Sequence, residues 1–120
     1  MRVSNRKPKL AVGLALLAVA VAACRSEPPQ PIRVQPTRLI IQNQTASPWS
    51  QVEVWLNDHY RVTAPRLEAG QQLVIPLDVF VAGFGQRFDA RKQVVQGIEV
   101  TARSGDGRPV KLVWGRGRRR

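Results

Sequence analysis

The chain has 120 residues, 43% of them hydrophobic and 22% charged, which is the size and composition of one small globular domain. Its formal net charge is +11, and it contains a single cysteine and a single histidine. These residues are too few for a disulfide framework, a zinc cluster or a catalytic dyad, so we expect no metal, no cofactor and no enzymatic activity.

The first 23 residues have the composition of a signal peptide. Four basic residues and no acidic ones precede residue 10, and residues 10–23 form an unbroken apolar run. As a helix, this run would rise about 21 Å, which is short of the ~30 Å hydrocarbon core of a membrane. We therefore expect the segment to be cleaved rather than to stay in the membrane as a permanent helix.

The end of this segment, Val21-Ala22-Ala23-Cys24, resembles the lipobox of bacterial lipoproteins. The resemblance implies that Cys24 becomes the first residue of the mature protein and carries acyl chains on its thiol and its amino group. Because Arg25 rather than an aspartate follows, it also favours the outer membrane, facing the periplasm. The alternative is an ordinary secretory signal with a cysteine that happens to lie nearby.

Residues 24–37 are expected to form a tether. Four prolines fall within nine residues, at positions 28, 29, 31 and 36, and this composition favours extended polyproline II rather than a folded segment. At ~3.1 Å per residue, fourteen residues could hold a domain up to about 40 Å from the membrane. The folded domain is accordingly expected over residues 38–115.

The first half of this domain predicts short strands. Residues 38–43 are rich in β-branched side chains, and a loop follows at 45–50. Residues 51–56 alternate strictly, which places Val52, Val54 and Leu56 on one face, and turn residues at 57–59 lead to a partner strand at 60–63. Residues 65–70 break the pattern. A strand at 72–77 is expected at a sheet edge, since Pro76 cannot donate a ladder hydrogen bond.

The second half is irregular before it becomes regular. Phe80, Phe84 and Phe88 lie in a stretch interrupted by glycines, which we interpret as a connection whose aromatic rings cap the core. Residues 93–103 and 109–114 alternate on either side of a turn at 104–107, which predicts a C-terminal hairpin. Six or so strands without a convincing amphipathic helix predict an all-β fold, a small β-sandwich.

Several of these residues also occur in a pattern similar to small immunoglobulin-like domains of bacterial envelope proteins, including FxLYD-type modules. They are the polar turn at 43–45, Trp49, the alternating strand at 52–56, Gly70, the Ile75-Pro76-Leu77 strand, Phe80 and the aromatic end of the 85–88 segment. The resemblance implies an immunoglobulin-like sandwich. It assigns no catalytic residue.

One candidate site lies on the strand at 51–56. Alternation places Trp55 with Glu53 and Asn57 on the face opposite the valines. Either this face is covered by a loop, or these three residues form an exposed aromatic patch that binds a partner or a glycan. His59 and the polar segment at 43–45 are interpreted as ordinary turn residues.

The other candidate site is the C-terminal tail, residues 116–120. Residues 38–115 carry nine basic and seven acidic side chains, whereas Arg116, Arg118, Arg119 and Arg120 add four positive charges at the end. Since the excess charge lies outside the domain, nucleic-acid binding is not expected. The tail could instead contact anionic membrane phosphates, at about 1 kcal/mol per arginine, or it could simply be solvated.

Two functions follow from these observations. The first is a lipid-anchored, non-enzymatic interaction or structural accessory protein of the cell envelope, with an unknown envelope protein as its partner. The alternative is a protein that binds anionic lipid, lipopolysaccharide or polymer through the arginine tail, and whose binding falls steeply as salt rises.

Overall fold

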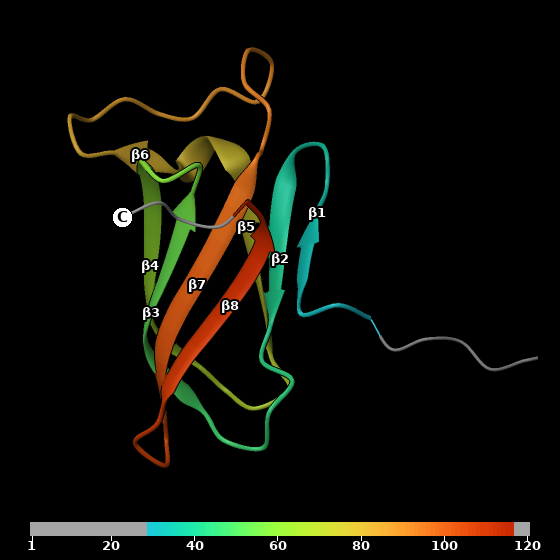
Figure 1. The fold of residues 1–120 in the computed structure, drawn as a ribbon, viewed down its shortest axis with the longest axis vertical. Coiled ribbons are helices and arrows are strands. Elements are labelled where there is room, and N and C mark those ends of the chain that lie inside the picture. The colour runs from blue at the N-terminus through green and yellow to red at the C-terminus, as the bar shows by residue number, and fades with distance from the viewer. Residues whose placement is uncertain (1–28, 117–120) are drawn as a thin grey trace, which may run out of the picture.

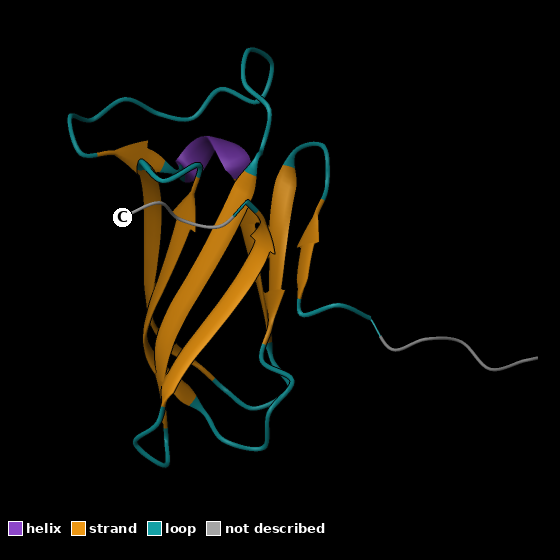
Figure 2. Ribbon diagram, viewed as in Figure 1, coloured by secondary structure: helices purple, strands orange, loops and turns teal. Residues whose placement is uncertain are grey.

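The computed structural model describes residues 29–116, which fold into two antiparallel sheets packed face to face (Figure 1). One sheet has the order β1-β2-β5 and the other the order β6-β4-β3-β7-β8. The strands are β1 (Ile32–Val34), β2 (Arg38–Gln42), β3 (Trp49–Leu56), β4 (Tyr60–Leu67), β5 (Gln72–Pro76), β6 (Val81–Ala82), β7 (Gly97–Ser104) and β8 (Pro109–Gly115). One turn of 3-10 helix, η2 (Leu77–Val79), interrupts the strands and loops (Figure 2). The predicted all-β class and small β-sandwich are confirmed.

The core lies between the sheets, where alternating residues of both point inward. Val52, Val54 and Leu56 of β3 are completely buried, as their spacing predicts. From the facing sheet, Leu39 and Ile41 of β2 join the same hydrophobic cluster. Both predicted hairpins are also present, with β3 paired to β4 around residues 57–59 and β7 paired to β8 around the turn at 104–107.

Strand β3 starts earlier than the sequence pattern predicts. Trp49 lies in the strand and is buried, although residues 45–50 were expected to form a loop. The cause is a β-bulge, because the pairing with β7 shifts register between Ser50 and Glu53, and Gln51 has φ 53°. An extra residue at the bulge allows Trp49 and Val52, three positions apart, to face the same core.

Strand β4 also extends further than predicted, and its proline explains why this is tolerated. It continues to Leu67 through Pro65, which was expected to end the pattern. The neighbouring strand β6 pairs only with Tyr60 and Arg61, so Pro65 lies in the half of β4 that has β3 as its one neighbour. Pro76 behaves as expected, since it ends β5 at the edge of its sheet.

The tether is shorter than the proline content suggests. Ile32–Val34 forms β1, which pairs with β2 through Ile32↔Ile41 and Val34↔Leu39, and the Ile32 side chain is in the core. The expectation that residues 24–37 are unfolded is therefore wrong from Ile32 onward. Prolines 31 and 36 flank this strand without interrupting it, so they leave its ladder hydrogen bonds intact. Cys24 lies outside the described residues.

The three phenylalanines of the irregular segment do not act together. Phe80 and Phe88 are buried, and the Phe88 ring packs edge-on against Tyr60 at a centroid distance of 5.3 Å. Phe84 is 78% exposed, so the expectation that it caps the core is wrong. A tight turn, closed by the Gly85 N–H donating to the Ala82 carbonyl at 2.9 Å, places Phe84 at its tip instead.

The polar segment at 43–45 has the predicted turn role, and Asn43 is its centre. The Asn43 side chain is completely buried. Its Nδ2 donates to the carbonyls of Ser47 at 2.9 Å and Leu67 at 3.1 Å, and its Oδ1 accepts from the Thr45 backbone N–H and hydroxyl. One amide group thereby ties the β2–β3 loop to the end of β4.

We expect Asn43→Ala to destabilise the domain by about 2 to 3 kcal/mol, because it removes the four hydrogen bonds of a buried amide. For a domain of this size the melting temperature should fall by roughly 10 to 20 °C. Thermal unfolding followed by circular dichroism measures this loss. Gln44→Ala, an exposed substitution in the same loop, is the control and should stay within about 0.5 kcal/mol of the parent.

Candidate functional site

The candidate site is the outer face of the five-stranded sheet, on the side away from the core. Strand register aligns two rows of side chains across this face. From β4 to β8, one row is Arg61, Trp55, Glu99 and Val113, and the next is Thr63, Glu53, Thr101 and Lys111. The predicted pair Trp55 and Glu53 thus lies at the centre of the sheet.

Trp55 is held in place by two polar neighbours. Its indole Nε1–H donates a hydrogen bond to Oε1 of Glu53 at 3.1 Å, and the Arg61 guanidinium carbon lies 5.3 Å from the centroid of its ring. The Trp55 side chain is half-buried. Its exposure is therefore intermediate between the two predicted alternatives, a covered face and an exposed patch. The ring therefore presents aromatic surface in a fixed orientation.

Beside this ring the surface is hollowed. A depression of about 480 Å³ runs from Trp55 towards β6. Its walls include His59, Arg61, Thr63 and Val81. The hollow lies at this edge because β6 has only two residues and covers little of β4. It combines an aromatic ring, a cation and an apolar rim, the side-chain types that are enriched where proteins contact partners.

Asn57, the third predicted member of the group, does not share this hollow. It has φ 50° and lies in the β3–β4 turn, where its Oδ1 accepts from the backbone N–H groups of Gln96 at 2.7 Å and Gly97 at 3.2 Å. Its Nδ2 donates to the Val94 carbonyl at 2.8 Å. These bonds fasten the turn to the loop before β7, so the Asn57 side chain acts on the fold rather than on a partner.

A buried carboxylate, Glu99, was missed by the sequence pattern. It lies between Trp55 and Val113 on the outer face, yet it is only 2% exposed. Lys111 Nζ is 3.7 Å from its Oε1. Alternation in β7 correctly predicts that the Glu99 side chain points away from the core. Its burial on the outer face depends on the size of the side chains on the adjacent strands, which the pattern of a single strand does not reveal.

The arginine tail is described only in part. Arg116 donates its backbone N–H to the Gln96 carbonyl at 3.0 Å and its guanidinium to Oε1 of Gln96 at 2.7 Å, so this first arginine is attached to the domain. Arg118, Arg119 and Arg120 lie outside the described residues, as does Cys24. His59 is exposed in its turn, as predicted.

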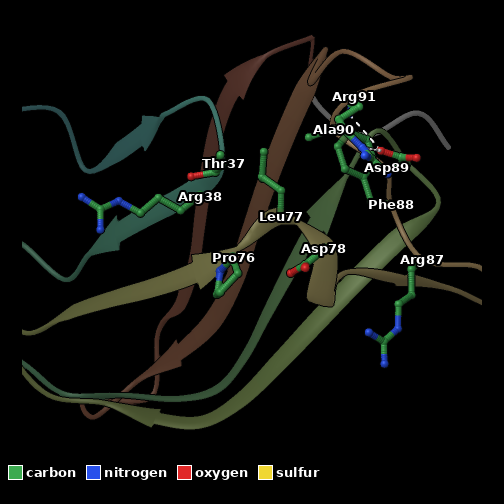
Figure 3. Close-up of a pocket in the computed structure, with 10 residues that line it drawn as sticks. All are labelled: Thr37, Arg38, Pro76, Leu77, Asp78, Arg87, Phe88, Asp89, Ala90 and Arg91. Atoms are coloured by element: carbon green, nitrogen blue, oxygen red, sulfur yellow. Dashed lines mark hydrogen bonds and ion pairs between the residues drawn. The ribbon is translucent and has the colours of Figure 1, made fainter.

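A further hollow, of about 710 Å³, lies where β2, β5 and the segment before β7 meet (Figure 3). Arg38 and Arg87 extend on opposite sides of it, and neither guanidinium points at the other. Arg91 forms an ion pair with Asp89, with 3.6 Å between Nε and Oδ1. These polar groups do not converge on a common point, as a small-molecule site requires.

Within residues 29–116, no three histidine, cysteine, aspartate or glutamate side chains gather as they would around a metal ion. No helix in this part of the chain is long and apolar enough to cross a membrane.

Fold and site together define a small β-sandwich whose five-stranded sheet carries an ordered aromatic group on its outer face. Comparison of the chain with protein-family models, curated proteins and solved structures gave no match.

Proposed function

We propose that this protein is a lipid-anchored protein of the bacterial cell envelope that works without catalysis, as an interaction module. Its contact surface is the outer face of the five-stranded sheet around Trp55, and its partner is another envelope protein. The anchor is Cys24, at the outer membrane and facing the periplasm.

The Trp55 arrangement is the observation that carries this proposal. A tryptophan on an outer sheet face, with its N–H bonded to Glu53 and Arg61 over its ring, is pre-organised, so little side-chain entropy remains to be lost when a partner binds. Val81 and Val113, on the β6 and β8 sides of this face, add exposed apolar surface. An aromatic centre surrounded by charged groups matches the anatomy of protein interfaces.

The anchor is supported by the sequence. Cys24 is the chain's single thiol, and a thiolate is the nucleophile that can accept a lipid group. The lipobox-like residues before it favour this chemistry over an ordinary secretory signal. Eight residues, 24–31, then separate the lipid from β1 and span about 25 Å when extended.

Crosslinking in the living cell tests the contact surface. A photoreactive amino acid at Thr63, beside the hollow, should yield one adduct of defined mass with an envelope protein. Trp55→Ala should reduce this adduct about tenfold or more, as expected for truncation of a central aromatic residue, and Trp55→Phe should retain part of it. Because the aromatic centre carries most of the contact, raising the salt from 0.1 to 0.5 M should change it little.

The control is the same photoreactive group at Val74, an exposed position on the outer face of the other sheet. Equal adducts from Thr63 and Val74, or an adduct indifferent to Trp55→Ala, would contradict the proposed surface. A Trp55-independent adduct that disappears at high salt would indicate the arginine tail instead.

A further inference from the structure

One end of the sandwich gathers most of the exposed apolar side chains of the described chain. It is the upper end in Figure 1, where η2, β6 and the long loop before β7 meet the β1–β2 and β3–β4 turns. Four of the six exposed large hydrophobic residues lie there: Val79, Val81, Phe84 and Val94. Phe84 and Val94 are 78% and 75% exposed, the highest values among the six.

The backbone holds Phe84 out into solvent. Gly83 and Gly85 flank it, and Gly85 has φ 92°, a conformation that favours glycine. Hydrogen bonds from Gly85 N–H to the Ala82 carbonyl at 2.9 Å and from Ala82 N–H to the Gln86 carbonyl at 2.8 Å close the turn on both sides. The exposure of this ring is therefore a property of a hydrogen-bonded turn.

Cations surround these apolar residues. Arg116 and Phe84 line one hollow of about 740 Å³, and the backbone of Arg87 pairs with that of Val81 at the base of the Phe84 turn. The charged residues at this end are Arg38, Arg61, Arg87, Arg91, Lys92 and Arg116 against Asp58, Asp78 and Asp89. Asp89 lies beside Arg91, and three further arginines follow Arg116 in the sequence.

We propose that this end of the domain docks on an anionic membrane surface, with Phe84 entering the boundary between headgroups and acyl chains and the surrounding cations contacting lipid phosphates. Arginine and lysine near anionic headgroups gain attraction, and a ring at the level of the boundary loses its contact with water. A soluble polyanion would satisfy the cations but would leave Phe84 and Val94 in water. The combination of the two therefore favours a lipid surface.

This docking is centred on Phe84 and the proposed partner contact on Trp55, with Val81 at the border of both, and the docking does not require the lipid anchor. The chain approaches β1 from the side of the sandwich rather than from its upper end, and Gln44 Nε2 donates a hydrogen bond to the Pro29 carbonyl at 2.7 Å. A lipid on Cys24 would leave about 25 Å of tether before β1, enough for the domain to lie over and touch the same membrane with its Phe84 end.

Vesicle binding by the unlipidated chain 25–120, which retains every contact described above, tests the proposal. It should sediment with vesicles of equal parts phosphatidylglycerol and phosphatidylcholine at 50 mM salt, and far less with phosphatidylcholine alone. Phe84→Ala should weaken binding about fivefold or more, and Arg87→Glu with Lys92→Glu about tenfold or more. Unchanged melting temperatures would show that these exposed substitutions leave the fold intact.

Matched controls separate the site from general charge and apolarity. Val74→Ala removes exposed apolar surface from another face, and Arg103→Glu with Arg108→Glu makes the same charge change at the opposite end. Both should bind within about twofold of the parent at 0.1 M salt, since charges beyond the ~10 Å screening length contribute little. In Phe84→Trp, lipids brominated on their acyl chains should quench additional fluorescence, and in Val74→Trp they should not.

Two results would overturn the proposal. In the first, a chain that ends at Arg116 loses vesicle binding, whereas Phe84→Ala and the double variant Arg87→Glu with Lys92→Glu bind like the parent. The tail alone would then be the contact. The other is equal, Phe84-independent binding to soluble polyphosphate, which would identify a polyanion site without membrane insertion.

Discussion

Val54→Asp is expected to abolish cooperative unfolding of the domain. Val54 is completely buried at the centre of β3, opposite Val62 of β4 and Val100 of β7. A carboxylate there has no partner, and its burial costs about 4 kcal/mol or more. A domain of this size lies near the lower end of the about 5 to 15 kcal/mol range of total stability, so most of its stability would be lost.

The measurement is thermal unfolding of chain 25–120 by circular dichroism, with near-ultraviolet signals reporting the packing of the tryptophans. Gln51→Asp is the matched control, since it adds the same charge to the same strand at an exposed bulge position whose φ of 53° aspartate tolerates. It should melt within a few degrees of the parent. A cooperative, parent-like transition in Val54→Asp would contradict the assignment of this face to the core.

Cys24→Ala is expected to remove lipid attachment completely. No other side chain in the protein is a thiol, so no residue can substitute for Cys24 as the acceptor of the acyl group. Cells fed a clickable palmitate analogue should label the parent protein and leave Cys24→Ala unlabelled. The variant should accumulate as an uncleaved precursor or leave the membrane fraction, because one lipid chain contributes ~0.8 kcal/mol per buried methylene.

Ser26→Ala, two residues further on, is the control and should label like the parent. Arg25→Asp probes the second part of the expectation: labelling should persist, while the protein should move from the outer to the inner membrane fraction. Equal labelling of the parent and Cys24→Ala would show that the cysteine is incidental to an ordinary secretory signal.

Regular local patterns predicted much of the fold correctly. Alternation in β3 and β8 identified the inward faces, because a pleated strand turns successive side chains to opposite sides whatever its partners are. Turn residues at 57–59 and 104–107 located both hairpins, since these residue types adopt turn geometry locally. Pro76 marked an edge strand, because its missing N–H excludes it from a central ladder.

The candidate site was predicted only in part. Trp55 and Glu53 were expected to be neighbours because they are two residues apart on one strand face, and the structure adds the hydrogen bond between them. Asn57 was included by extending the alternation one step too far, into a turn where φ becomes positive. Arg61 and Val81 were not predicted as members, since strand register and a short β6 bring them to the hollow.

Local patterns in the sequence were sufficient for the all-β class, the inward faces of β3 and β8, the two hairpins and the turn role of Asn43, because each depends on interactions over a few residues. The tertiary structure decided that Ile32–Val34 pairs with β2, that Gln51 forms a bulge, that Glu99 is buried and that Phe84 is exposed. Each of these depends on which segment lies beside it, and pairing between distant segments is selected by the packing of the whole core rather than by local preference.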